Sequence, residues 1–289
     1  MRIYILPVAE ELQPITQGFI WPPGCDDYGI EQDMLIWLQE SDLLTDNPDE
    51  ADWHYLPVFW NRWFWQNQED ASGRGAFNDA IQAAILDRNR TFTVDEADPS
   101  GVQPDVDLSG ITVCTGNRMY DNGMIDVPLL LNPHPMNVNP EKKYLASFIG
   151  QVATHPVRFE MMEEVDSRTD SYITGEFHSI EEFTKVIQSS YVALAPRGDG
   201  AQSYRMYEAM QLGVVPLYIS DIDARPFRQW LDWDAFSLYL PSAEGLDDLL
   251  DGLDRDDLAY MGVAAQWAYY EHLRYGEWCK YVVKELEIR

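Results

Sequence analysis

One stretch, residues 191–221, constrains the fold of this chain more than any other. It reads YVALAPRGDGAQSYRMYEAMQLGVVPLYISD: an apolar β-rich run, a loop, a helix-forming segment over residues 203–212 and a second apolar run. Gly213 follows the helical segment, where a helix end favours a residue that can adopt positive φ. A strand, a helix and a strand in this order predict one unit of a parallel sheet, and hence an α/β fold.

The loop and the helix start of this unit carry groups suited to a phosphate-containing ligand. Open α/β sheets bind ligands at the carboxyl ends of their strands, where a helix N-terminus offers backbone N–H groups. Arg197 lies in the loop and Arg205 in the first helical turn, and each guanidinium matches phosphate oxygens. Glu208, one turn further on, is placed to accept from a pair of ribose hydroxyls. The spacing equally fits a surface ion pair between Arg205 and Glu208, worth roughly a few tenths of a kcal/mol.

This segment resembles the signature of the exostosin family of glycosyltransferases. The family pattern is an apolar strand, Pro-Arg-Gly, Ser-x-Arg-x-x-Glu-Ala, then Gly, Pro and Ser-Asp between apolar residues. The matching positions are Pro196, Arg197, Gly198, Ser203, Arg205, Glu208, Ala209, Gly213, Pro216, Ser220 and Asp221. The resemblance implies the GT-B form of the α/β class, two Rossmann-like domains facing across a cleft. It implies that the C-terminal domain binds the nucleotide-sugar, with a donor site made of Arg158, Arg197, Gly198, Ser203, Arg205 and Glu208.

A second, weaker resemblance to the same family lies near the N-terminus. The family carries Tyr-x-x-Glu before a helix and Pro-x-Glu-Ala-Asp before a strand that ends near a proline. The matching positions are Tyr28, Glu31, Pro48, Glu50, Ala51, Asp52 and Pro57. Many relatives then have a Gly-x-Asp-His-Phe segment, which this chain lacks, although Arg74 and Asn78 stand near the expected place.

We expect three parts in the chain of 289 residues, a length that fits two domains of about 140 residues each. They are an N-terminal Rossmann-like domain on the acceptor side (1–135), a C-terminal Rossmann-like domain that binds the donor (136–270) and a C-terminal helix packing back on the first domain (271–289). The spacing of apolar residues predicts an amphipathic helix over residues 30–40. We also expect helices over residues 76–89 and 246–253 and a strand over 53–60. Ser179 and Glu182 form a capping box before a helix that runs to residue 189. The aromatic residues of the C-terminal tail are predicted to be core: Trp267, Tyr270, Tyr275 and Trp278.

Composition excludes several classes of partner. A net charge of −29 and a pI near 4.2 disfavour nucleic acid and acidic membrane surfaces. No window of about 18 apolar residues occurs, and residues 1–20 lack the pattern of a signal peptide, so we expect no membrane span. The three cysteines have no metal or disulfide spacing, which favours reduced thiols in a cytoplasmic protein. Acidic residues spread along the chain suggest a salty environment.

The resulting hypothesis is transfer of a sugar from a nucleoside diphosphate sugar, UDP-linked in our expectation, to a saccharide or other hydroxyl acceptor. The resemblance implies inversion, which needs a general base, and Glu31 and Asp98 are the candidates. We expect no cofactor and no metal, although Asp221 and Asp223 have the Asp-x-Asp form that binds a metal–nucleotide complex in another glycosyltransferase fold. The alternative is a non-catalytic nucleotide- or sugar-binding protein that retains only the donor site. The missing histidine segment favours that alternative.

Overall fold

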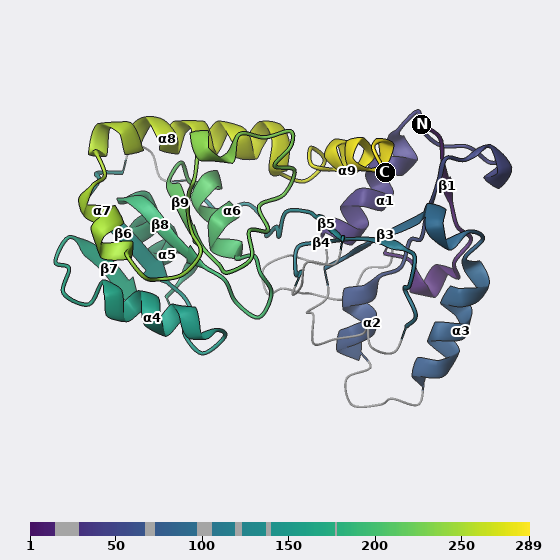
Figure 1. Ribbon diagram of the computed structural model, residues 1–289, viewed down its shortest axis with the longest axis horizontal. Helices are drawn as coiled ribbons and strands as arrows, with labels where there is room; N and C mark the ends of the chain where they lie inside the picture. Colours follow the sequence, from purple (N-terminus) through teal and green to yellow (C-terminus); the bar gives the residue numbers. More distant parts are fainter. Residues whose placement is uncertain (15–28, 67–72, 97–105, 119–122, 137–139, 177) are drawn as a thin grey trace. The chain divides into compact units, whose positions relative to one another are not determined.

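The computed structural model describes residues 1–14, 29–66, 73–96, 106–118, 123–136, 140–176 and 178–289 (Figure 1). The chain forms two compact units, the first made of residues 1–131 and 275–289 and the second of residues 132–274. In the part of the chain that the structure describes, each unit contains a five-stranded sheet in which all neighbouring strands run parallel. The α/β class with two Rossmann-like domains is therefore confirmed.

The sheet of the first unit has its strands in chain order. They are β1 (Ile3–Ile5), β2 (Trp53–Tyr55), β3 (Thr91–Asp95), β4 (Thr112–Thr115) and β5 (Ile125–Asp126). The α-helices of this unit are α1 (Ile30–Glu40), α2 (Trp60–Gln66), α3 (Arg74–Ala84) and α9 (Cys279–Glu287). One side chain, Asp33 of α1, fixes the C-terminal segment: its carboxylate accepts from Gly276 N at 2.8 Å and from Trp278 Nε1 at 2.7 Å.

The sheet of the second unit has the order β10-β9-β8-β6-β7, which places β8 in the centre. The strands are β6 (Tyr144–Ile149), β7 (Ser171–Thr174), β8 (Ser190–Pro196), β9 (Val215–Ile219) and β10 (Leu238–Leu240). The α-helices are α4 (Pro156–Glu164), α5 (Ile180–Gln188), α6 (Tyr204–Gln211), α7 (Leu246–Asp251) and α8 (Arg255–Ala268). Side chains of α4 and α7 share a core with Val192 and Leu194 of β8, whereas those of α5 and α6 pack with Ala193. Because successive strand residues face opposite sides, the two helix pairs cover opposite faces of the sheet.

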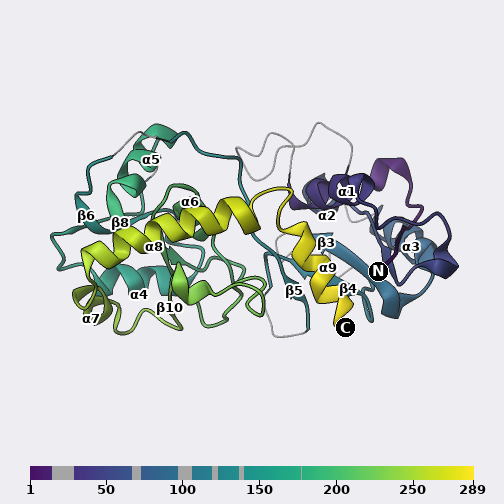
Figure 2. The same cartoon turned by 90° about the horizontal axis from the view of Figure 1, so that it is seen from above.

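The long helix α8 runs over the second unit, as Figure 2 shows from above. A Cβ atom at Gly262 would lie 2.6 Å from the carbonyl oxygen of Gly213, so only glycine permits this close approach to the end of α6. Gly213 has φ +73°, as its place after the helix predicts. None of the described helices is both long and apolar enough to cross a membrane.

Three local predictions were wrong. The strand expected over residues 53–60 ends at Tyr55, and α2 begins at Trp60, whose buried indole donates to Thr93 Oγ1 at 2.9 Å. The helix expected over 76–89 ends at Ala84, before a 3₁₀ turn capped by Asp87. Trp267 is 60% exposed, because α8 packs through small residues on its other face, whereas Trp278 is core as predicted.

Candidate functional site

The loop between β8 and α6, residues 197–203, lies at the carboxyl end of the central strand of the second sheet. β8 ends at Pro196, and Ser203 is the N-cap residue of α6 but makes no side-chain hydrogen bond to that helix. The loop therefore leads directly into a helix N-terminus, where the helix dipole favours negative charge. The residues predicted to bind the donor gather around this loop.

Arg197 is 5% exposed at the start of the loop. Its Nη1 donates to the carboxylate of Asp221, which follows β9, and its backbone N–H donates to Ile219 O at 2.9 Å. Burial raises the pKa of Asp221, but the hydrogen bond and charge of Arg197 outweigh burial and lower it overall. Among the described residues, the buried Nε of Arg197 has no hydrogen-bond partner. The guanidinium thus keeps one donor for another acceptor.

Arg158 of α4 holds the loop through its backbone. Nε donates to Arg197 O at 2.9 Å, Nη2 to Pro196 O at 3.3 Å and Nη1 to Gln151 O at 2.6 Å. Burial, followed by the charge of Arg205, lowers the pKa of Arg158 to about 10. The structure therefore gives Arg158 a positioning role in the loop as well as a positive charge beside it.

Polar side chains crowd the position of Gly198. A Cβ atom added there would lie 3.2 Å from Arg158 Nη2 and 3.7 Å from Thr154 Oγ1. The hydroxyl of Thr154 is buried and has no hydrogen-bond partner in the part of the chain that the structure describes. Buried polar atoms are nearly always paired, so this hydroxyl and Arg197 Nε, which belong to residues beside Gly198, are both available to a ligand.

Glu208 and Arg205 form the ion pair that their spacing allows, but the carboxylate is buried rather than on the surface. Glu208 is 5% exposed, with one carboxylate oxygen accepting from Arg205 Nη1 and the other 2.6 Å from His134 Nε2. Arg205 also donates Nε to Ile149 O at 2.7 Å and lies over the ring of Phe183, 4.4 Å from its centroid. Burial raises the pKa of Glu208, but Arg205 and His134 outweigh burial and hold it below its ordinary value.

His134 is a part of this site that the sequence did not identify. It lies far from Glu208 in the chain, between Pro133 and Pro135. Besides its contact with Glu208, its backbone N–H donates to Gln211 Oε1 at 3.0 Å, so it contacts two residues of α6.

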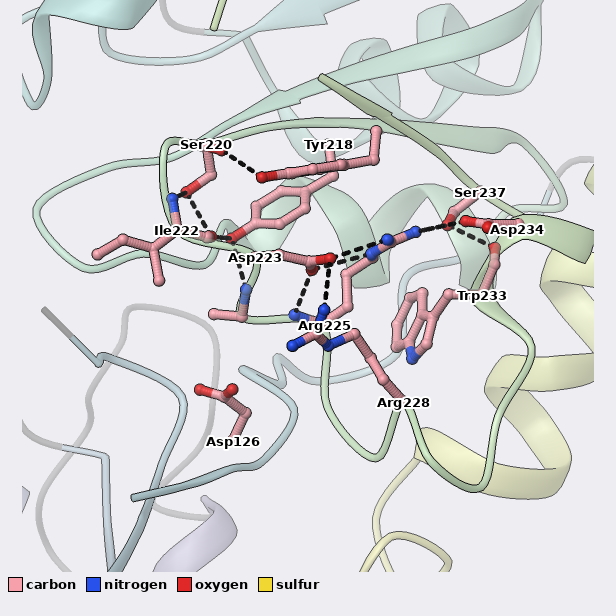
Figure 3. Close-up of polar contacts among 12 residues, drawn as sticks. Asp126, Tyr218, Ser220, Ile222, Asp223, Arg225, Arg228, Trp233, Asp234 and Ser237 are labelled. Carbon is pink, nitrogen blue, oxygen red and sulfur yellow. Dashed lines mark hydrogen bonds and ion pairs between the residues drawn. The ribbon is translucent and has the colours of Figure 1, made fainter. Parts of the chain in front are cut away.

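The two aspartates of the Asp-x-Asp segment are both engaged by arginines. Asp221 pairs with Arg197, whereas Asp223 accepts from Arg225 Nε at 3.0 Å and Nη2 at 2.9 Å and from Arg228 Nη1 at 2.9 Å (Figure 3). Among the described residues, no group of three or more His, Cys, Asp or Glu side chains could hold a metal ion.

The general-base candidates belong to the first unit. Glu31 of α1 is completely buried, and its carboxylate accepts from the backbone N–H groups of Asn61 and Glu96 at 3.0 to 3.4 Å. Burial, followed by the charge of Asp95, raises the pKa of Glu31 well above its ordinary value. Asp98 lies outside the described residues. The sequence did not single out Glu96, which follows β3 and has a pKa raised to about 8 by burial.

Comparison with known proteins relates this chain to glycosyltransferases. Residues 108–249 match the model of a family described as the Exostosin GT47 domain. Exostosin-1 homolog of Caenorhabditis elegans is 21% identical over 94% of this chain and 81% of that protein. Probable arabinosyltransferase ARAD1 of Arabidopsis thaliana is 22% identical over 82% of this chain and 63% of that protein, so the match spans less than two thirds of it. The chain is therefore similar to glycosyltransferases of the exostosin family.

Two solved structures align with this chain at low sequence identity. AviGT4, a glycosyltransferase involved in avilamycin A biosynthesis, aligns with a TM-score of 0.42 and 12% identity over 99% of this chain and 97% of that chain. The crystal structure of TarM aligns with a TM-score of 0.41 and 10% identity over 72% of this chain and 57% of that chain.

Proposed function

We propose that this protein transfers a sugar from a UDP-sugar to a hydroxyl of a saccharide or other acceptor, with inversion and without a metal ion. The observation that carries the proposal is the unpaired Nε of Arg197, buried beside Gly198 at the N-terminal end of α6. Charge develops on the leaving diphosphate during transfer, and fixed donors at that position stabilise it. Similarity to exostosin-family glycosyltransferases supports the transfer reaction itself.

The second unit supplies the donor-side groups in this mechanism. Arg197 Nε, the hydroxyl of Thr154 and the α6 N-terminus bind the diphosphate, while Arg205 adds charge. Glu208 is already hydrogen-bonded by Arg205 and His134, but a carboxylate has about four acceptor positions, so two remain for ribose hydroxyls. The contacts with Arg205 and His134 hold the carboxylate in one orientation before the nucleotide binds, which lowers the entropic cost of binding.

Metal independence is supported by the pairing of Asp221 and Asp223. A divalent cation at these carboxylates would have to displace Arg197 from the first and Arg225 and Arg228 from the second. The arginines supply the positive charge that a metal ion supplies elsewhere.

Inversion requires a base that takes the proton of the acceptor hydroxyl. We keep Glu31 and Asp98 as the candidates from the first unit. For Glu31, burial raises the pKa above its ordinary value, which makes the ionised carboxylate a stronger base. We also propose that the protein works in the cytoplasm and binds no nucleic acid, in keeping with its charge of −29.

The proposal is tested by incubating the protein with UDP- and GDP-sugars, including arabinosyl donors because of the arabinosyltransferase relative, and with saccharide acceptors. We expect a glycosylated product from a UDP-sugar, at a rate that EDTA leaves unchanged. Loss of the product on chelation would refute metal independence. Binding of UDP without transfer or donor hydrolysis for any pair would favour the non-catalytic alternative, which the missing histidine segment supports.

A further inference from the structure

We propose that the loop after β9 forms a saccharide-binding pocket, in which Trp230 stacks on a sugar ring and Arg228 hydrogen-bonds its hydroxyls. The inference rests on the proposed function, and it assigns the acceptor or growing glycan chain to a definite part of the second unit. The pocket has a volume of about 560 Å³ and is lined by Arg225 and residues 228–234. Small-molecule sites are typically about 300–1,000 Å³.

The backbone of this loop is held in a conformation that costs free energy. Phe227 has φ +58° and is the one residue other than glycine with positive φ among the described residues. For a bulky side chain this conformation is unfavourable, and such strain is retained where the surrounding structure fixes it, often at binding sites. Here Trp233 Nε1 donates to Pro226 O at 2.7 Å, and Trp230 N donates to Phe227 O at 2.8 Å.

An ion-pair network holds the wall of the pocket (Figure 3). Arg225 is 8% exposed, donates to both oxygens of Asp223 and to Asp234 Oδ1 at 3.1 Å, and lies over the ring of Tyr239 at 4.9 Å. Arg228 Nη1 donates to the same Asp223, which holds one end of the guanidinium, while the side chain stays 54% exposed. The network presents Arg228 in a defined place without burying it.

The exposed groups of the pocket fit a neutral, hydroxyl-rich ligand. Trp230 is 39% exposed, and an aromatic face of this kind packs well against the C–H groups of a sugar ring. Two arginines and two aspartates line the pocket, so their charges cancel and a polyanion gains little there. Guanidinium, amide and carboxylate groups all hydrogen-bond to hydroxyls.

Within the second unit, the loop after β9 contacts the loop of residues 197–203, which we call the donor loop. Asp221, which pairs with Arg197, lies four residues before Arg225 in the chain. The hydroxyl of Tyr218 is 2.7 Å from Ala201 O in the donor loop and 2.8 Å from Ile222 O in the loop after β9. The two loops therefore follow neighbouring strands and share a buried contact near the start of the loop after β9.

The test uses the full chain labelled with 5-fluorotryptophan, and fluorine NMR during titration with neutral trisaccharides of glucose, galactose, mannose, xylose or arabinose. We expect at least one trisaccharide to shift the resonance that Trp230→Ala removes. Trp230→Ala should weaken that binding by about tenfold or more, and Arg228→Gln should weaken it too. Trp267→Ala removes a more exposed tryptophan from α8 and is the matched control, with unchanged binding.

Binding of none of the trisaccharides, or full affinity in Trp230→Ala, would overturn the proposal. Binding that Trp267→Ala weakens equally would also overturn it. Titration of the same samples with UDP separates this inference from the proposed function. Trp230→Ala should bind UDP as the parent does, and absence of UDP binding in all samples, with saccharide binding intact, would instead refute the donor site.

Discussion

Replacing Glu208 by Gln tests whether the buried carboxylate organises the donor site. The two oxygens of Glu208 accept from Arg205 and from His134, and the residue is 5% exposed. Glutamine keeps one acceptor oxygen but places an NH₂ group where the second oxygen was, and it removes the charge. A hydrogen bond to a charged group contributes about 1.5–3 kcal/mol, so we expect a loss of local stability in that range around α6.

The pH dependence of this loss gives a sharper expectation. The pKa of Glu208 is lowered in the folded protein, so its contribution is present above its unfolded value of about 4.5 and disappears as pH falls through the folded pKa. The difference between parent and Glu208→Gln should therefore shrink at acid pH. Hydrogen exchange of the α6 and β8 amides measures this stability difference locally, and it does not require both units to unfold together.

The matched control is Glu181→Gln, an exposed glutamate at the start of α5 in the same unit. It makes the same change of charge and should alter exchange of α6 by less than about 0.5 kcal/mol. Equal exchange in Glu208→Gln and the parent, or a difference that does not change with pH, would refute the reasoning. Titration calorimetry adds the functional readout: UDP affinity should fall in Glu208→Gln but not in Glu181→Gln.

Three further predictions follow from the same contacts. Arg205→Lys cannot donate to both Ile149 O and Glu208 as Arg205 does, so turnover should fall by about tenfold or more even where UDP still binds; transfer at the parent rate would show that the guanidinium is dispensable. The pKa of Glu96 is raised to about 8, so the folded protein keeps a proton that the unfolded chain loses above about pH 4.5, and the first unit should lose stability between these values. Glu96→Gln should flatten that slope in urea unfolding and be the more stable form near pH 8, whereas parallel curves for variant and parent would contradict the expectation. The charge of −29 should make the melting temperature rise from about 0.05 to about 2 M KCl while UDP affinity falls only modestly, and a flat or falling melting temperature would contradict this.

The sequence predicted the second unit well because its signals are local. The apolar run of β8, the helix α6 and the positive φ of Gly213 all follow from residues adjacent in the chain. The capping box of Ser179 and Glu182 is likewise present as predicted. In such segments short-range propensity and the final packing agree, so pattern alone is sufficient.

The missed features depend on contacts between distant segments. His134 contacts Glu208 although many residues separate them in the chain, and no local sequence pattern near either residue predicts the contact. Trp267 was expected in the core from its type, but the periodicity of α8 places Gly262 and Ala265 on the buried face instead. The pairing of Asp221 with Arg197, which lies at the end of another strand, was also not foreseen, because an aspartate after a strand does not by itself indicate its partner.

The central claim is that residues 197–203 and the start of α6 bind the diphosphate of a nucleotide-sugar, and a hydrogen-exchange difference map with and without UDP tests it most directly. We predict slower exchange in two segments of the second unit, the donor loop 197–203 with the first turn of α6 and the segment around Thr154 and Arg158. Both protections should disappear in Arg197→Gln, which removes the unpaired Nε donor. A map with no protection in these segments at saturating UDP, or with protection that Arg197→Gln leaves unchanged, would contradict the account.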